Sequence, residues 1–358
     1  MIEIIKQGIV ASRPKQMYGW PGITRAANGD IIVAASERKR HICPWGHQVI
    51  IRSTDNGHTW QLPQEVYNSE LDDRDANIVT LKDGTLVLSW FTSDAFIKYH
   101  KSMECTLIAE RAARVTEQMR CELLGTWMLK SYDHGENWDI KPLRIPVGMH
   151  ISPTQLSDGS LLSIGWEGLF QNGAQKALCC YQSNDLGESW SKTFTFECPQ
   201  KDGMPVLNEN HVLEVAPGKL IAMFRKCGDF LYQASSSDYG KTWTTPQQTE
   251  IWGFPPHLLK LGDGRVLCMF GHRRRPYSIR GVISADNGQT WDINNTFTLY
   301  EWKDELDMGY PVSLEVAPGE LLTVFYCNRR DEATPNTPEP WKTSNAPEGI
   351  LSVRYRIR

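Results

Sequence analysis

A short motif that recurs five times constrains the fold of this chain more than any other feature. In each copy the Asp can accept hydrogen bonds from the backbone of its own turn, the Gly permits a positive φ, and the Trp can bury its ring between neighbouring units. We therefore expect a repeated structural turn, and no catalytic role for its Asp residues. The copies are STDNGHTW from Ser53, SYDHGENW from Ser131, SNDLGESW from Ser183, SSDYGKTW from Ser236 and SADNGQTW from Ser284.

A second series of tight turns alternates with the first and indicates six repeated units. Each turn is flanked by short apolar runs that read as strands, so each unit is predicted to be a four-stranded antiparallel sheet. Six such units arranged radially form an all-β, six-bladed β-propeller, here a single domain over residues 1–358. We expect Ile350–Arg356 to be the third strand of the last blade and Ile2–Val10 to close the ring as its fourth. The turns lie at Asn28-Gly29, Asp83-Gly84, Asp158-Gly159, Pro217-Gly218, Asp263-Gly264 and Pro318-Gly319.

The second unit is longer than the others and carries an insertion at 93–126. Within it Ile108, Ala112, Val115 and Met119 recur at helical spacing, which predicts one amphipathic helix inserted in blade 2. This helix either packs on the rim of the propeller or serves as a lid or a contact in a homo-oligomer. A second irregular stretch, Arg329–Gly349, is rich in Pro, Thr and Asn and predicts a long loop.

Composition excludes several classes of partner. The 38 Lys and Arg residues against 42 Asp and Glu residues give a net charge of -4 without a basic stripe, so we expect no nucleic-acid binding. The chain has neither a long apolar run nor the pattern of a secretory signal, which predicts a cytoplasmic protein without a membrane partner. Its nine cysteines are scattered without a CxxC pair, which favours structural thiols over a zinc site. We expect no metal and no cofactor.

Blade topology separates the turns into two faces. The connections opposite the repeated motifs gather around the central funnel, where ligand sites are expected. A dense set of charged and aromatic residues falls on that face, and its desolvation would be costly without a ligand or mutual pairing. Structural ion pairs are the alternative explanation for each member, but not for the whole set. The set includes Trp20, Arg38, His41, His47, Arg74, Asp75, Glu209, His211, Arg225, Trp252, His257, Arg274, Arg275, Tyr277 and Tyr310.

The five motifs and their setting resemble the sialidase (neuraminidase) superfamily over almost the entire chain. That resemblance implies three arginines that bind the substrate carboxylate, a Tyr nucleophile activated by a Glu, and an Asp as general acid/base. By position, Tyr310 resembles the nucleophile, Glu209 the activating Glu and Arg225 the second arginine. Among Arg273, Arg274 and Arg275, the last is expected to match the third arginine.

Other positions depart from the family pattern in a consistent way. Gly19-Trp20-Pro21 stands where the family has Arg-Ile-Pro, so the first arginine is missing, and the carboxylate that steadies it is replaced by Tyr326 or Cys327. His47 stands in place of the acid/base Asp. We interpret these changes as a retuned pocket in which Asp75 or His47 is the acid/base. The residues expected to contact substrate are Trp20, Arg38, Arg74, His211, Arg225, His257, Arg274, Arg275 and Tyr277.

The resemblance and these residues predict a sialidase-like exo-glycoside hydrolase that removes a terminal acidic sugar from a glycan, with carbohydrate as its partner. One alternative is a polysaccharide lyase, in which Tyr310 or a His abstracts a proton beside a uronate carboxylate. The other is a non-catalytic sugar-binding propeller, in which the rings of Trp20, Trp252 and Tyr277 form stacking platforms.

Overall fold

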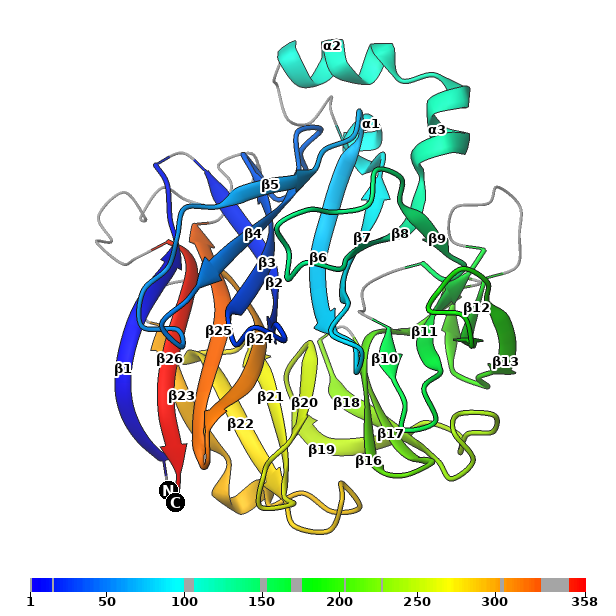
Figure 1. The fold of residues 1–358 in the computed structure, drawn as a ribbon. Coiled ribbons are helices and arrows are strands. Elements are labelled where there is room, and N and C mark those ends of the chain that lie inside the picture. Colours follow the sequence, from blue (N-terminus) through cyan, green and yellow to red (C-terminus); the bar gives the residue numbers. More distant parts are fainter. Residues whose placement is uncertain are drawn as a thin grey trace.

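The structure, a computed structural model, describes residues 2–14, 16–99, 106–148, 153–168, 176–202, 204–226, 228–302, 306–329 and 348–358. Six four-stranded antiparallel sheets form the blades of a propeller (Figure 1). The innermost strands of neighbouring blades contact one another around the axis, as β2 does with β6 and β24. The predicted six-bladed propeller is therefore confirmed.

The blades follow one another along the chain, each from its innermost strand outward. The strands of the first three blades are β2 (Met17–Arg25), β3 (Ile31–Arg38), β4 (His47–Ser53), β5 (Gln64–Tyr67), β6 (Asp72–Thr80), β7 (Leu86–Ser93), β8 (Gly125–Ser131), β9 (Leu143–Ile145), β10 (Thr154–Gln155), β11 (Leu161–Glu167), β12 (Ala177–Ser183) and β13 (Ser191–Thr195).

The second half of the chain contributes three more blades and a two-stranded hairpin. These strands are β14 (Gln200–Lys201), β15 (Met204–Pro205), β16 (Leu207–Ala216), β17 (Lys219–Lys226), β18 (Phe230–Ser236), β19 (Gln247–Trp252), β20 (Pro256–Lys260), β21 (Val266–His272), β22 (Tyr277–Ser284), β23 (Phe297–Trp302), β24 (Leu306–Ala317) and β25 (Glu320–Arg329), with the 3-10 turn η2 (Ile293–Asn295) before β23.

The last blade joins the two ends of the chain. Its third strand is β26 (Gly349–Ile357) and its outermost strand is β1 (Ile2–Ala11), with Ile2 opposite Ile357. The two termini therefore lie side by side, as Figure 1 shows. Antiparallel pairing between the first and last strands closes the ring as predicted, with boundaries that differ by a residue or so.

The repeated motif forms the same turn in all five copies. In the first, the amide of Gly57 donates to Ser53 Oγ (2.7 Å) and the amide of Thr59 donates to Asp55 Oδ1 (2.8 Å). These turns join third to fourth strands, so they lie on the same side as the Gly turns that join first to second strands. The opposite side, which we call the funnel face, carries the connections between second and third strands and between blades.

The hydrophobic core is divided among the spaces between blades. One cluster joins Leu162 and Phe196 of the third blade to Phe224 and Trp243 of the fourth. The Trp243 indole, from the fourth motif, donates to Gly240 O within its own turn at 3.0 Å. The Trp of a motif thus packs between neighbouring blades, as its sequence pattern predicted.

The described residues of the insertion, 93–99 and 106–126, form three short helices rather than the single helix that the periodicity predicted. They are α1 (Ala95–Tyr99), α2 (Thr106–Arg114) and α3 (Glu117–Leu123). The helical path is interrupted before Thr116. The side chain of Thr116 accepts a hydrogen bond from the amide of Met119 and so caps the start of α3. Ile108 is fully buried against Leu71 and Phe96, so α2 is anchored to the propeller.

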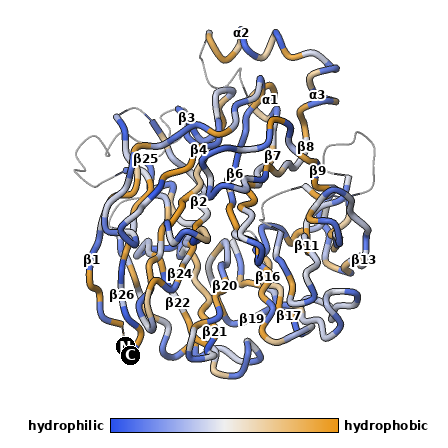
Figure 2. The backbone as a smooth tube through the Cα atoms, viewed as in Figure 1, coloured by the Kyte–Doolittle hydropathy of each residue, from blue (hydrophilic) through white to orange (hydrophobic). Residues whose placement is uncertain are grey.

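Figure 2 shows hydrophobic and hydrophilic residues alternating along α2, consistent with one buried and one exposed side. Within the described residues, no helix has the length and hydrophobicity that crossing a bilayer requires. The predicted loop at 330–347 lies outside the described residues, as do residues 150–152 of the funnel face.

Candidate active site

Four blades place a residue in the same unusual backbone conformation at the funnel face. Trp20, Asp75, Glu209 and Tyr310 have φ values of 53°, 59°, 32° and 53°, in the left-handed region that bulky residues avoid. Each lies on the innermost strand of its blade at an irregularity in the pairing with the second strand. β-Bulges and strained φ values of this kind concentrate at functional sites, where they direct a side chain.

Arg225, at the end of β17, connects two of these residues. Its guanidinium forms an ion pair with Glu209, and the same Nη1 atom donates to the Tyr310 hydroxyl at 3.3 Å. Its Cζ atom lies 4.4 Å from the centroid of the Phe254 ring. Arg225 therefore joins Glu209 of its own blade to Tyr310 of the last blade, and the three residues predicted to share a site are brought together.

The environment of Tyr310 keeps its hydroxyl protonated. Burial raises its pKa well above the usual value, the charge of Glu209 raises it further, and Arg225 opposes that rise. A neutral phenol is a poor nucleophile, so any attack by Tyr310 requires transfer of its proton to a nearby base. Glu209 is the carboxylate with the largest effect on this pKa.

A second arginine reaches Tyr310 from the connection after β21, and it is Arg273 rather than the predicted Arg275. Arg273 donates to Met308 O (2.8 Å) and to the Tyr326 hydroxyl (3.0 Å), and its Cζ lies 5.8 Å from the Tyr310 ring centroid. Arg275 is exposed, with its Cζ 5.9 Å from the Tyr277 ring. The arginine nearest the end of the strand therefore turns toward the axis.

Asp307 and Tyr326 hold Arg273 in place. The Tyr326 hydroxyl donates to Asp307 Oδ1 at 2.6 Å, and His41 Nδ1 lies 2.6 Å from Asp307 Oδ2. Burial alone would raise the pKa of Asp307, but the hydrogen bond and charge of His41, together with Arg273, hold it below its usual value. Asp307 is thus a buried carboxylate whose negative charge stabilises Arg273.

Trp20 fills the position where the family resemblance implied an arginine, and cations lie against its ring. The Cζ atoms of Arg38 and Arg74 are 4.8 and 4.6 Å from the ring centroid, and both arginines pair with the buried Asp72. Trp20 is 3% exposed and its ring centroid is 6.4 Å from that of Tyr310. A sugar ring could not stack on Trp20 in this arrangement. Trp20 contacts the Tyr310 ring instead, and Arg74 packs on Trp20.

The two candidates for the acid/base occupy different places. Asp75 is buried on the innermost strand of blade 2, and its charge contributes to the raised pKa of Tyr310 and of Tyr326. His47 begins β4, where its Nδ1 atom is 3.2 Å from Trp45 O and its Nε2 atom 3.7 Å from Glu65. Of the two candidates, Asp75 is therefore the one whose charge acts on Tyr310.

The other expected contact residues divide between the axis and the outer strands. His211 and His257 line an axial cavity of 400 Å³, and Trp20, Glu209 and Tyr310 line the same cavity. The ring centroids of the two histidines are 4.5 Å apart. Burial lowers the pKa of both histidines. Arg274 covers the Trp252 ring at 3.8 Å, and Tyr277 packs in the outer part of blade 5. These last residues are not brought together with Tyr310.

Sequence reasoning did not assign roles to Arg273, Asp307 and Tyr326. Position at the end of the second strand of a blade was the available signal, because Arg225 is the second-last residue of β17 and Arg273 directly follows β21. The pairing of Asp307 with Tyr326 had no such signal, since it depends on the register between β24 and β25.

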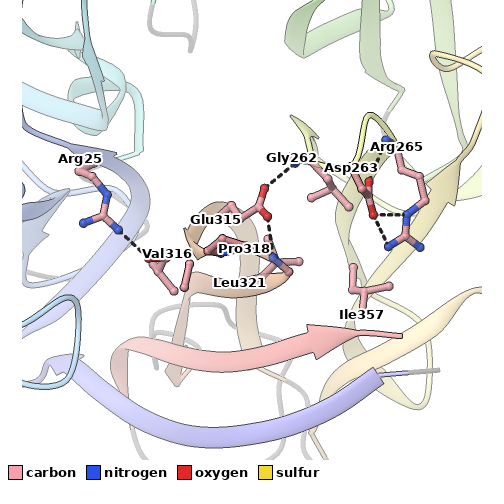
Figure 3. Close-up of a pocket in the computed structure, with 12 residues that line it drawn as sticks. Arg25, Gly262, Asp263, Arg265, Glu315, Val316, Pro318, Leu321 and Ile357 are labelled. Atoms are coloured by element: carbon pink, nitrogen blue, oxygen red, sulfur yellow. Dashed lines mark hydrogen bonds and ion pairs between the residues drawn. The ribbon is translucent and has the colours of Figure 1, made fainter.

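A cavity of 620 Å³ lies on the opposite face and offers no comparable chemistry. Figure 3 shows its polar groups paired with one another: Glu315 accepts from the Gly262 amide (2.7 Å), Arg265 pairs with Asp263 (2.7 Å) and Arg25 donates to Val316 O (3.2 Å). Elsewhere too, the described part of the chain contains no group of three or more His, Cys, Asp or Glu side chains suited to a metal ion.

Comparisons with known proteins agree with the β-propeller fold. A protein of unknown function from Dyadobacter fermentans superimposes with a TM-score of 0.75 at 21% identity, covering 100% of this chain and 99% of that one. The Hadza microbial sialidase Hz136 gives 0.65 at 18% identity over 95% of this chain and 65% of its own length. A K499G mutant of the NanB sialidase from Streptococcus pneumoniae gives 0.64 at 14% identity, over 98% and 70%.

At these identities the structural likeness establishes the fold alone. No curated protein sequence matches the chain. The model of the BNR repeat-like domain family matches residues 112–322, which is more than half of the chain. This chain therefore belongs to the BNR repeat-like domain family, and it shares the β-propeller fold of the two sialidases.

Proposed function

We propose that this protein is an exo-glycoside hydrolase that removes a terminal acidic sugar, with Tyr310 as its nucleophile. The observation that carries the proposal is the contact of one guanidinium, Arg225, with both the Glu209 carboxylate and the Tyr310 hydroxyl. A tyrosine, a carboxylate and a cation held together at the mouth of a propeller form a nucleophile–base pair beside an anion-binding group. The sialidases with the same fold support this choice of reaction.

The arginines would select the substrate. Arg225 and Arg273 approach the ring of Phe254 at 4.4 and 5.5 Å, so two cations gather beside Tyr310. A carboxylate on the sugar would form charge-assisted hydrogen bonds with them, which a neutral sugar cannot form with the same strength. A site with two arginines would hold a carboxylate less firmly than one with three.

In the proposed reaction Tyr310 attacks the anomeric carbon while Glu209 accepts the phenolic proton. The glycosidic bond breaks as Asp75 donates a proton to the leaving oxygen, which gives a tyrosyl-linked sugar. Water, deprotonated by Asp75, then displaces Tyr310, and Glu209 returns the proton to the phenolate. Arg225 would stabilise the negative charge that develops on the Tyr310 oxygen.

Turnover by matched variants tests this assignment. We expect Tyr310→Phe and Glu209→Gln each to lower kcat/KM on an aryl glycoside of an acidic sugar by roughly 10²–10⁴-fold. Tyr132→Phe and Glu188→Gln make the same chemical changes in exposed turns of the opposite face and should retain full activity. If both site variants keep wild-type turnover on a true substrate, the roles assigned to Tyr310 and Glu209 are wrong.

The products separate the proposal from its two alternatives. A lyase would release an unsaturated uronate that absorbs in the ultraviolet, and a hydrolase would incorporate oxygen from labelled water. A sugar-binding propeller would bind glycans without turnover. The geometry gives that alternative little support, because Trp20 is 3% exposed and Arg274 covers Trp252 at 3.8 Å.

A further inference from the structure

A second cavity, which we call the rim cavity, lies on the funnel face between blade 1 and the helical insertion. It measures 450 Å³, and its walls come from the β3–β4 connection, the β5–β6 connection and helix α2. The lining residues that matter for recognition are Arg38, Lys39, Trp45, His47, Glu70 and Arg111.

The rim cavity is lined by more cations than anions. Arg38, Lys39 and Arg111 contribute three positive charges, and Glu70 is the single carboxylate among the described residues that line it. Glu70 pairs with Arg111 at 2.7 Å, and the buried Asp72 behind the wall pairs with Arg38. Within the described part of the chain, the Lys39 ammonium has the Trp45 ring at 5.2 Å and no carboxylate.

Hydrogen-bonding capacity at the rim cavity is also incompletely used. In the described structure Nη1 of Arg38 and Nε of Arg111 are buried without an acceptor. Unpaired donors of this kind are costly, and an anion is the acceptor that binds a guanidinium most strongly. The Trp45 ring beside Lys39 adds an aromatic surface of the kind that packs against sugars.

Arg38 connects the rim cavity to the proposed catalytic group. The same side chain lines the cavity and packs on Trp20, whose ring centroid is 6.4 Å from that of Tyr310. The β3–β4 connection separates the two places, with His41 contacting Asp307 on one side and Trp45 lining the cavity on the other. A chain of sugars that ends at Tyr310 and reaches the rim cavity would therefore have to cross the β3–β4 connection.

The insertion forms a fixed wall of this cavity. Ile108 is fully buried against Leu71 and Phe96, and Arg111 follows it by one helical turn. Helix α2, anchored through Ile108, therefore holds Arg111 at the cavity. The insertion thereby contributes a charged residue to the cavity wall.

We propose that the rim cavity is a subsite for an anionic sugar on the leaving-group side of the substrate. Its ligand is a carboxylate or sulfate ester carried by the sugar next to the terminal one. The substrate of the proposed hydrolase is then a polyanionic oligosaccharide. This consequence for turnover rests on the proposed function, whereas binding at the rim cavity does not.

Affinity measurements on three tetrasaccharides test the subsite in the Tyr310→Phe protein, which should not consume them. The probes are tetragalacturonate for carboxylates, a keratan sulfate tetrasaccharide, which carries sulfate esters and no carboxylate, for sulfates, and neutral chitotetraose. We expect Lys39→Gln to weaken binding of the acidic probes roughly tenfold, the loss of one charge-assisted contact. Glu70→Gln should strengthen it several-fold. The matched control Arg114→Gln, on the exposed side of α2, should have no effect.

The outcomes separate the subsite from the proposed function. Equal affinity for acidic and neutral probes, or unchanged affinity in Lys39→Gln and Glu70→Gln, would overturn the subsite even if aryl glycosides are hydrolysed. If charge-dependent binding follows the two variants but Tyr310→Phe retains turnover, the subsite stands and the catalytic assignment fails. A preference for the carboxylate over the sulfate probe, or the reverse, identifies the anion.

Discussion

Backbone conformation at single residues positions the candidate site as much as side-chain identity does. Trp20, Asp75, Glu209 and Tyr310 occupy equivalent left-handed positions in four blades, each of which costs about 1–3 kcal/mol of strain. Topology predicted that these residues share a face. It could not predict the bulges, because a register irregularity depends on pairing with the next strand and has no signature in one sequence.

Neighbouring residues with similar chemistry were the hardest to resolve from sequence. Arg273 and Arg275 are two positions apart, and the family resemblance favoured the second. The structure turns Arg273 inward because its guanidinium donates to Met308 O and Tyr326, which belong to the next blade. Contacts between blades decide such cases, and a local sequence pattern contains no information about them.

The buried carboxyl of Asp73 provides a residue-level prediction for stability. Burial raises its pKa to about 7, against the opposing effect of hydrogen bonds from Thr92 and Ser69. Because the folded state then binds a proton more tightly than the unfolded state, the contribution of Asp73 to stability falls as pH rises from about 4 to 7. Asp73→Asn removes this titration. The free energy of unfolding of Asp73→Asn minus that of wild type should therefore be roughly 2–4 kcal/mol higher at pH 8 than at pH 5.

Urea unfolding of both proteins at pH 5 and pH 8 measures this difference. Asp83→Asn, in an exposed turn, is the matched control and should show little change between the two conditions. A pH-independent difference between Asp73→Asn and wild type would show that the Asp73 carboxyl does not titrate in this range.

At the scale of elements, the repeated turns were predicted in detail and the insertion only in outline. The motif encodes its own hydrogen bonds between residues two to four apart, so the sequence contains all of its determinants. The insertion obeys helical periodicity, but Thr116 ends one helix and caps the next. Ile108 and Val115 pack in the same cluster despite that break, which is why their spacing resembled one helix.

The fifth motif allows a pH-dependent test of this structural role. Thr290 and Ser284 hydrogen bonds lower the pKa of Asp286 to about 2, against an ordinary value of 3.8. A carboxyl with a lowered pKa stabilises the fold above pH 4, and that contribution is lost as pH falls through about 2. We expect Asp286→Ala to lower the midpoint of thermal unfolding at pH 7 and to have a smaller effect near pH 2. Activity should be unchanged, because the turn lies on the face opposite Tyr310.

Calorimetry at the two pH values, together with an activity assay, checks this prediction. Asp292→Ala, just beyond the same motif, is a suitable control for removing a nearby carboxylate. Loss of activity at unchanged stability in Asp286→Ala would contradict the structural reading of the motif.

At the scale of the whole molecule, the sequence predicted the ring and its closure because both follow from counting repeats. The last blade takes three strands from the C-terminal end and its outermost strand from the N-terminal end. The strand β1 covers β26 along its length, and Val10 and Ala11 contribute to the core between blades 6 and 1. The helical insertion and the rim cavity are additions to this ring, so the ring itself did not reveal them.

Ring closure predicts that the N-terminal strand matters but the position of the chain ends does not. Deleting residues 1–11 would expose the edge of β26 and part of a core cluster, and exposed edges promote association between chains. We expect this variant to aggregate or to unfold at a markedly lower temperature.

A circular permutant that joins Arg358 to Ile2 through a short Gly-Ser linker and opens between Asp158 and Gly159 keeps every strand. It should unfold in one transition within a few degrees of wild type, because the new ends lie in an exposed turn. A deletion variant that melts like wild type would mean that β26 does not need β1, and that the ring is held by contacts between blades alone.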